Sequence, residues 1–302
     1  MKIGVIGGSG FIGSHVVDKL VDAGHNVTIF DIMKPHRDDI RFINLDITDS
    51  NKCNIALTGD FDVIYLLAAM ANVNDVMNNP LEASLLNIQS VANVLEASRK
   101  NNIGRVILAS TIWVYSHCDE QNVNEDSSIQ INRADHVYTS TKIAAELLCQ
   151  SYQKLYNKDF TILRYGIPYG PRARGGTILA IYIKKALSGE ALTIFGDGSQ
   201  FRKFLYVEDL AEGNVAALNP IARNKIYNLE GSTSITIKTL ADTVCKLVKD
   251  VGIEYKNTRP GDFAGKNITA EKAYKELGWY PKTIFEDGVQ KYIEWYKKEM
   301  KL

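Results

Sequence analysis

A tyrosine and a lysine in the segment HVYTSTK (136–142) have the types and spacing of an acid–base pair. If residues 137–153 form a helix, Tyr138 and Lys142 lie on one face of it, one turn apart. A lysine cation close to a phenol favours the phenolate and lowers the tyrosine pKa from about 10. Tyr138 could then take up and return a proton. The chain holds 15 tyrosines, so such a spacing also arises by chance, and other segments must decide.

Two hydroxyl side chains end the apolar run RVILAST (105–111). Catalytic groups of open α/β sheets gather beyond the carboxyl ends of strands, and Ser110 and Thr111 stand at such an end. Thr111 could hold a substrate oxygen while Tyr138 moves its proton, with Ser110 as a second hydroxyl beside it. Hydroxyls at these places also cap helices or complete turns.

The first residues of the chain contain a glycine pattern, GGSGFIG, directly after the apolar run KIGVI (2–6). Gly7, Gly10 and Gly13 have the spacing G-x-x-G-x-x-G, and a helical pattern begins at Phe11. A glycine turn between a strand and a helix allows main-chain N–H groups to approach a pyrophosphate at the helix N-terminus. The pattern predicts a dinucleotide site.

Asp31 closes the second apolar run, NVTIFD (26–31). A carboxylate at this place accepts hydrogen bonds from the adenosine ribose and repels a 2′-phosphate, which favours NAD over NADP. Asp31 could also be a solvated residue at a strand end, and Lys34 and Arg37 are nearby cations that could accept a phosphate.

These segments belong to a regular alternation of strands and helices. β-branched runs at 2–6, 26–30, 41–45, 62–67, 105–110 and 160–164 alternate with helical patterns such as 11–24 and 81–100. The alternation predicts a parallel, doubly wound sheet with helices on both faces, an α/β fold of the Rossmann type. We assign residues 1–166 to it.

After residue 166 the pattern changes to loops rich in glycine and proline, short strands and scattered helices. We expect residues 167–302 to form a smaller, irregular α+β part that binds substrate, with 226–230 returning to the large sheet as a strand. The boundary is soft, and both parts should fold together.

Composition narrows the classes of partner. The 302 residues are 45% hydrophobic and 23% charged, and Lys plus Arg equals Asp plus Glu at 35 each, so no net charge attracts the chain to nucleic acid. No apolar run is long enough to span a membrane, and no secretory signal is recognisable, so we expect a cytoplasmic protein. Its four cysteines lie far apart, which predicts neither a metal site nor disulfides.

The order of these segments is similar to that in the extended short-chain dehydrogenases/reductases, and within them the chain resembles the NAD-dependent epimerase/dehydratase family. The resemblance covers nearly the whole chain. It rests on segments that occur in the family's order: GGSGFIG, Asp31, LDITD around Asp46, LLAA (66–69), ASTIWVY, YTSTK, LRYGIPYGPR (163–172), GDGSQFRKFLYVEDLA (196–211), RPGD (259–262) and LGWYPKT (277–283).

The resemblance implies a role for individual residues. Tyr138 would be the general base and acid, Lys142 its electrostatic partner and a ribose ligand, and Thr111 the hydroxyl bound to the reacting oxygen. Residues that would contact NAD are Gly7, Gly10, Phe11, Ile12, Gly13, Asp31, Asp46, Ile47, Leu67, Ala68, Ala69, Asn87, Tyr138, Lys142 and Tyr165. Residues that would bind a nucleoside-diphosphate sugar are Arg202 and Arg259 at the phosphates and Asp262 near the nucleoside ribose.

The chain departs from the family at four positions. Members that eliminate water carry Asp-Glu after the catalytic threonine, and decarboxylases keep the glutamate, but this chain has Ile112 and Trp113, which argues against both reactions. Leu66 replaces a common histidine, and Ile167 replaces an asparagine that meets the substrate.

Three functions follow. We favour a nucleotide-sugar 4-epimerase, which passes hydride from sugar C4 to tightly bound NAD and back to the opposite face. The alternatives are an NAD(P)H-dependent reductase of 4-keto sugars and a dinucleotide-sensing module without catalysis. Helices expected at 81–100 and 137–157 carry more apolar positions than one buried face requires, which predicts a homodimer.

Overall fold

Seven parallel strands form the large sheet of the structure, a computed structural model that describes residues 1–257 and 266–300. The strands are β1 (Lys2–Ile6), β2 (Asn26–Asp31), β3 (Arg41–Asn44), β4 (Val63–Leu66), β5 (Arg105–Thr111), β7 (Asp159–Tyr165) and β11 (Lys225–Leu229). Their order across the sheet is β11-β7-β5-β4-β1-β2-β3, and each neighbouring pair is parallel. The chain moves outward from β1 to β3, returns to β4, and then moves outward on the other side, so the predicted doubly wound fold is confirmed.

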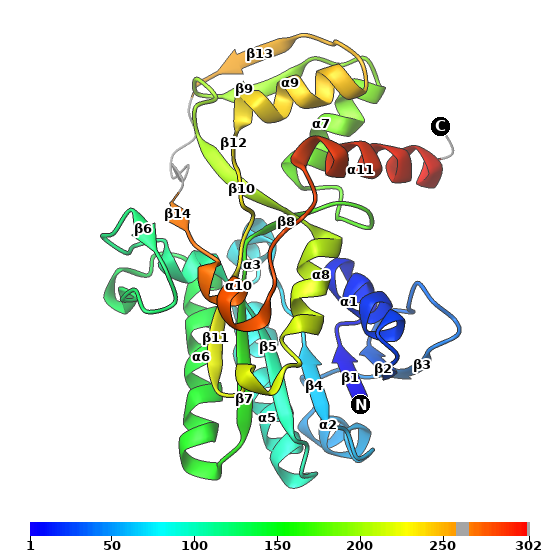
Figure 1. The fold of residues 1–302 in the computed structure, drawn as a ribbon, viewed down its shortest axis with the longest axis vertical. Coiled ribbons are helices and arrows are strands. Elements are labelled where there is room, and N and C mark those ends of the chain that lie inside the picture. Colours follow the sequence, from blue (N-terminus) through cyan, green and yellow to red (C-terminus); the bar gives the residue numbers. More distant parts are fainter. Residues whose placement is uncertain (258–265, 301–302) are drawn as a thin grey trace.

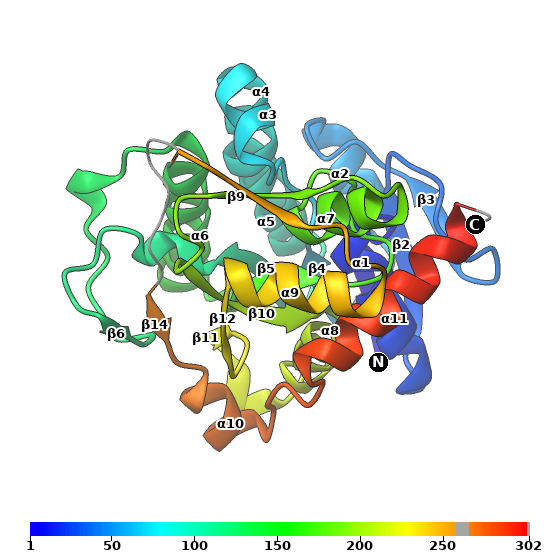
Figure 2. The same cartoon turned by 90° about the horizontal axis from the view of Figure 1, so that it is seen from above.

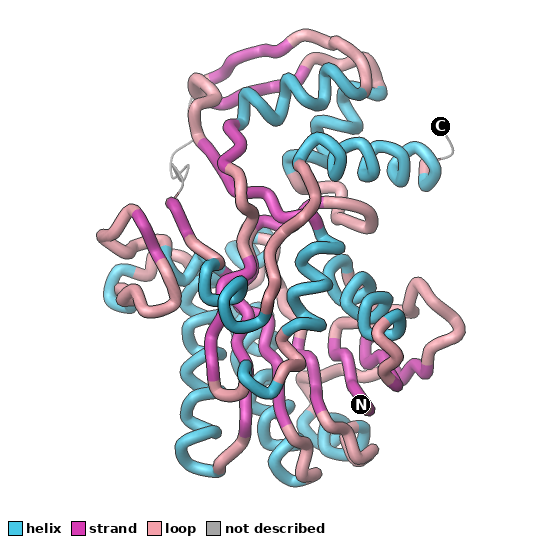
Figure 3. Tube along the Cα trace, viewed as in Figure 1, coloured by secondary structure: helices cyan, strands magenta, loops and turns pink. Residues whose placement is uncertain are grey.

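Helices cover both faces of this sheet, as the nearly continuous apolar strands require. On one face lie α1 (Phe11–Asp22), α8 (Val207–Ala216) and α10 (Glu271–Leu277); on the other lie α2 (Ser50–Ala56), α5 (Ser90–Lys100) and α6 (Val137–Tyr156). Alternate strand residues serve the two layers, for example Ile3 and Val5 in one core and Ile6 in the other. Figures 2 and 3 show these helices on the two sides of the strands.

The helix expected at 81–100 is not a single regular α-helix. It consists of α4 (Pro80–Ser84), a π-helical turn η1 (Leu85–Gln89) and α5, and the shorter α3 (Val73–Asn78) precedes it. The π turn changes the hydrogen-bond pattern within the segment, and such turns are frequent at functional sites. Here the turn contains Asn87, which is buried.

The second part of the chain lies beyond the carboxyl ends of the large sheet (Figure 1). Its strands are β8 (Ile167–Tyr169), β9 (Leu192–Phe195), β10 (Phe201–Tyr206), β12 (Ser234–Thr236) and β13 (Ile253–Lys256), and its helices are α7 (Ile178–Leu187), α9 (Ile237–Leu247) and α11 (Phe285–Glu299). They enclose a core of their own. Strand β11 leaves this part and pairs with β7 at the edge of the large sheet.

The remaining helices and strands are short. They are the 3-10 helices η2 (Ile112–Tyr115), η3 (Ile131–Arg133) and η4 (Pro220–Ala222), and the paired strands β6 (Asn122–Val123) and β14 (Asn267–Ile268). Within residues 1–257 and 266–300, none of the helices combines the length and the apolar character of a membrane span.

Candidate active site

A cavity of about 610 Å³ opens where the carboxyl ends of the large sheet meet the second part of the chain. This volume is typical of a small-molecule or cofactor site. The cavity is lined by the glycine turn, the ends of four strands, the start of α6 and the loop before α7. Sequence-predicted residues in its wall are Gly7, Gly10, Phe11, Ile12, Gly13, Asp31, Asp46, Ile47, Leu67, Ala68, Ala69, Thr111, Tyr138, Lys142 and Tyr165.

The glycine turn packs so closely that side chains are excluded. A Cβ on Gly13 would lie 2.0 Å from the carbonyl oxygen of Gly7, and Gly7 itself has φ of 84°. Helix α1 begins after this turn at Phe11, and no side chain caps its N-terminus. The unpaired N–H groups of a first helical turn bind anions well. This cradle fits the pyrophosphate of a dinucleotide.

Asp31 holds the neighbouring loops by hydrogen bonds and can still accept further hydrogen bonds from a ligand. Its two carboxylate oxygens accept hydrogen bonds from the N–H groups of Ser9 and Met33, both at 3.0 Å. Each oxygen keeps a further lone pair. Arg37, one of the two cations that could favour a phosphate, is bound to Asp39 and Asp18.

Asn87 does not reach the wall of the cavity, although the resemblance placed it along the cofactor. Its amide exchanges two hydrogen bonds of 2.9 Å with the main chain of Met70 and donates a third to Thr141 at 3.1 Å. Asn87 therefore ties the loop after β4 to α6. Leu66, which stands where a histidine is common, is buried in the core.

The sheet and α6 bring Thr111, Tyr138 and Lys142 into the same part of the cavity. His136 caps α6 by accepting a hydrogen bond from the N–H of Tyr138 at 3.1 Å, so the helix begins where the tyrosine stands. The hydroxyl of Thr111 accepts a hydrogen bond from the N–H of Trp113 at 3.2 Å and lies close enough to the phenol of Tyr138 to oppose the rise of its pKa that burial causes. The ammonium of Lys142 donates to the carbonyl oxygen of Ala109 at 3.0 Å.

The pKa values of this pair differ from the sequence-based expectation. Burial raises the pKa of Tyr138 to about 12, and the nearby hydroxyl of Thr111 opposes the rise. Burial lowers the pKa of Lys142 to about 8, and the charge of Glu146 opposes that fall. Lys142 does not lower the pKa of Tyr138 here because its ammonium is directed at Ala109.

Ser110 also lines the cavity, but its hydroxyl is bound to another group. It donates a hydrogen bond to Glu146 at 2.5 Å, and Arg164 binds the same carboxylate through Nε at 3.0 Å and Nη2 at 2.7 Å. The side chains of Glu146 and Arg164 are each 3% exposed. Arg164 also donates to the phenol of Tyr115 at 2.5 Å. This buried network was not predicted; its signal in the sequence is an arginine within the apolar run FTILRY.

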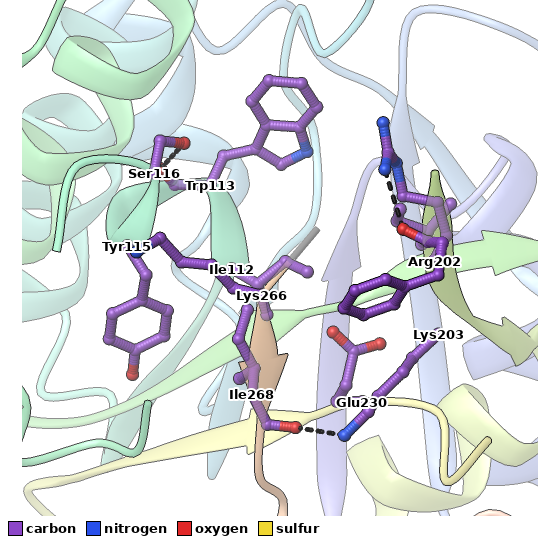
Figure 4. Close-up of a pocket in the computed structure, with 11 residues that line it drawn as sticks. Ile112, Trp113, Tyr115, Ser116, Arg202, Lys203, Glu230, Lys266 and Ile268 are labelled. Atoms are coloured by element: carbon purple, nitrogen blue, oxygen red, sulfur yellow. Dashed lines mark hydrogen bonds between the residues drawn. The ribbon is translucent and has the colours of Figure 1, made fainter. Parts of the chain in front are cut away.

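A second, smaller pocket adjoins the cavity and shares Trp113 and Ile167 with it. Arg202 lies at this second pocket, where its Nη1 donates to the carbonyl oxygen of Phe201 at 2.7 Å (Figure 4). Arg259 and Asp262, the other two residues predicted to bind substrate, lie outside the described residues.

Known proteins of similar sequence and structure carry out chemistry on nucleotide sugars. UDP-glucose 4-epimerase of Thermotoga maritima, solved with UDP-glucose, is 28% identical with a TM-score of 0.92 and covers 99% of this chain and 100% of its own. UDP-glucuronic acid 4-epimerase of Bacillus cereus, solved with UDP-glucuronic acid and NAD, is 29% identical with a TM-score of 0.90 over 99% and 100%. A UDP-N-acetyl-alpha-D-glucosaminuronate decarboxylase of Bacillus cytotoxicus is 30% identical over 97% of each chain.

The sequence profile of one family matches most of the chain. The NAD dependent epimerase/dehydratase family matches residues 3–229, which contain the glycine turn, Thr111, Tyr138 and Lys142. The resemblance predicted from the sequence is confirmed. The chain belongs to the NAD dependent epimerase/dehydratase family, and its cofactor is NAD.

Proposed function

We propose that the protein is a nucleotide-sugar 4-epimerase. The observation that carries the proposal is that Thr111, Tyr138 and Lys142 line the same cavity as the glycine turn. A hydroxyl and a phenol that are neighbours in one cavity can both face the same sugar oxygen. Their neighbours Ile112 and Trp113 have no ionisable group, so this segment offers no acid for elimination or decarboxylation.

In the proposed reaction, Tyr138 and Thr111 have different roles. NAD held at the glycine turn would supply the hydride acceptor for the sugar carbon and, in the return step, the hydride donor. Tyr138 takes the proton from the sugar hydroxyl and later gives it back, while Thr111 holds the same oxygen. Rotation of the ketone intermediate between the two steps exposes its other face.

Lys142 has a specific task, because a phenol with a pKa of about 12 is almost entirely protonated at neutral pH and so has no capacity to accept a proton. The ammonium of Lys142 must leave the carbonyl oxygen of Ala109 and approach the phenol, or a ribose hydroxyl next to it, during turnover. Its flexible four-carbon stem permits this movement.

The substrate is proposed to be a nucleoside-diphosphate sugar. Arg202 lies at the pocket next to the cavity, and a guanidinium matches phosphate oxygens in geometry and charge. Both solved relatives named above contain a UDP sugar.

One experiment separates the candidate reactions. Purified protein is incubated with UDP-glucose, UDP-galactose and their N-acetyl forms, without added cofactor, and the sugars are identified by NMR. The epimerase proposal expects interconversion of a pair. Turnover only of a 4-keto sugar with added NADH or NADPH would instead identify a reductase, and binding of NAD without any turnover would identify a sensor.

We also propose a homodimer formed through α4, η1 and α6. Four leucines on these elements are exposed, namely Leu81 at 81%, Leu85 at 47%, Leu147 at 48% and Leu155 at 71%. Helix α4 and the π turn both contact α6, so the elements that carry these leucines lie side by side. Apolar groups gathered in this way usually mark an interface.

A further inference from the structure

A buried glutamate that the proposed reaction does not use lies between the cavity and the second pocket. Glu230 follows β11 directly and is 3% exposed. Since Leu229 pairs with Tyr165, Glu230 stands beside Gly166, and a Cβ on Gly166 would lie 2.2 Å from its Oε1. Gly166 lines the cavity, while Glu230 lines the second pocket (Figure 4).

The carboxyl of Glu230 makes few interactions that could offset the free-energy cost of its burial. Its Oε1 accepts one hydrogen bond, from the N–H of Gly231 at 2.9 Å. Over the described ranges 1–257 and 266–300, no cation lies within ion-pair distance of it. Burial raises the pKa of Glu230 to about 8, although the charge of Lys203 opposes the rise. A buried carboxyl without a cation is costly to keep, and such groups are enriched at ligand sites.

The cations at this pocket are bound to other groups. Lys203 donates to the carbonyl oxygen of Ile268 at 3.0 Å (Figure 4) and to the side chain of Asn267 at 2.5 Å. Lys266 donates to two main-chain carbonyl oxygens on the loop after η2. Arg202 donates to the main chain of Phe201.

The second pocket has room for one small group. Its volume is about 30 Å³, which suits a hydroxyl, a hydroxymethyl or a water molecule. Four apolar side chains form much of its wall, namely Ile112, Trp113, Ile167 and Ile268. Because Trp113 and Ile167 also line the cavity, a substituent of a sugar held there can reach the carboxyl.

We propose that Glu230 is a specificity-determining residue, which binds one uncharged polar substituent of the sugar and excludes a sugar carboxylate. The inference rests on the proposed function and names its substrate class as neutral sugars. The protonated carboxyl offers one O–H donor and acceptor oxygens to a hydroxyl. A sugar carboxylate would require a cation of its own, but Lys203 and Lys266 already donate to main-chain carbonyl oxygens and Arg202 is assigned to the diphosphate. Ionised Glu230 would also repel it.

The experiment compares UDP-glucose with UDP-glucuronate on the same protein samples at pH 7 and pH 9. The kcat/KM of each sugar and its dissociation constant are measured for wild type, Glu230→Gln and Glu230→Leu. Glu254→Gln, on exposed β13, is the matched control. The ratio of the two sugars in one sample is insensitive to partial misfolding.

Wild type should favour UDP-glucose, and more strongly at pH 9, where Glu230 is mostly ionised. Glu230→Gln should shift the ratio towards UDP-glucuronate by at least about tenfold at pH 9 and remove its pH dependence. Glu230→Leu should weaken UDP-glucose by about tenfold, because it removes the hydrogen bond. Glu254→Gln should change neither ratio.

The outcomes separate this inference from the proposed function. Interconversion of UDP-glucose with no preference over UDP-glucuronate, or a ratio unchanged in Glu230→Gln, would overturn the role of Glu230 alone. Selective binding of UDP-glucose without interconversion would overturn the epimerase proposal and support Glu230. If neither sugar binds and UDP-galactose and the N-acetyl forms are not bound either, both proposals fall.

Discussion

Ser110 donates a hydrogen bond to Glu146 at 2.5 Å, whereas the next residue, Thr111, accepts one from the main-chain N–H of Trp113 at 3.2 Å. Both residues line the cavity, but adjacent side chains of a strand point to opposite faces, and the hydroxyl of Ser110 is held by Glu146. The sequence alone allowed Ser110 to replace Thr111, and the structure contradicts that.

Replacement of Thr111 by valine should therefore slow turnover by roughly 10²-fold, because no neighbouring hydroxyl can hold the sugar oxygen. The measurement is kcat at saturating sugar. Thr111→Ser, which keeps a hydroxyl, is the control and should retain most of the activity. More than about a third of wild-type activity in Thr111→Val would show that this hydroxyl is not needed.

Tyr138→Phe keeps the buried ring but removes the group that exchanges a proton with the sugar. Turnover should fall by roughly 10²–10⁴. Binding of NAD, measured by calorimetry, should stay close to that of wild type. Combined with Thr111→Val, the loss should be much smaller than the product of the two single losses, since the residues act as a unit. Near-normal turnover would mean that another group is the base.

Lys142 should contribute to activity at the expense of stability. Its pKa is about 8 in the folded protein and 10.5 in the unfolded chain, so between these values the unfolded chain binds more protons. Stability should therefore rise as the pH increases from 8 to 10.5, and the full penalty of the buried charge applies below pH 8.

Lys142→Met removes that charge and should raise the free energy of unfolding at pH 7 by roughly 1–3 kcal/mol, while turnover and NAD affinity fall. Urea unfolding of wild type and variant at pH 7 and pH 10 tests this, and the difference should be smaller at pH 10. A variant less stable than wild type at pH 7 would contradict the expected penalty.

Asp31 should determine the preference for NAD over NADP. Asp31→Asn removes the charge and keeps one acceptor oxygen, so one of the N–H groups of Ser9 and Met33 loses its partner, whereas Asp31→Gly removes the whole side chain. The ratio of NADP to NAD affinity should rise by about tenfold or more in Asp31→Asn, since one removed charge repulsion at short range is worth at least that much. A wild-type protein that prefers NADP would refute the assigned role of Asp31.

The fold was largely predictable because its signals are local. Buried parallel strands are short apolar runs, and the glycine turn marks the passage from β1 to α1, so each could be read within a few residues. The π turn at Leu85–Gln89 could not be found in this way, because apolar periodicity does not report which main-chain groups are hydrogen bonded.

Residues of the site could be predicted only where they belong to a short sequence motif. Thr111, Tyr138 and Lys142 could be proposed from short segments, but the pairing of Glu146 with Arg164 joins α6 to β7, and no local pattern specifies it. Glu230 was missed for the same reason. A charged residue within or directly after an apolar strand, as in FTILRY and YNLEG, is the one sequence signal that both share.

The proposed dimer should depend on Leu147. Leu147 is 48% exposed on α6, and a carboxylate there would have to be buried against the symmetry mate without a partner. Leu147→Asp should therefore raise the dimer dissociation constant by at least about 10²-fold, which sedimentation velocity at micromolar protein can measure. Ile221→Asp is the matched control, because Ile221 is 44% exposed on η4, which packs with α10 at the opposite face of the sheet. Wild-type protein that sediments as a monomer would remove the dimer proposal, and a dimer that survives in Leu147→Asp would place the interface elsewhere.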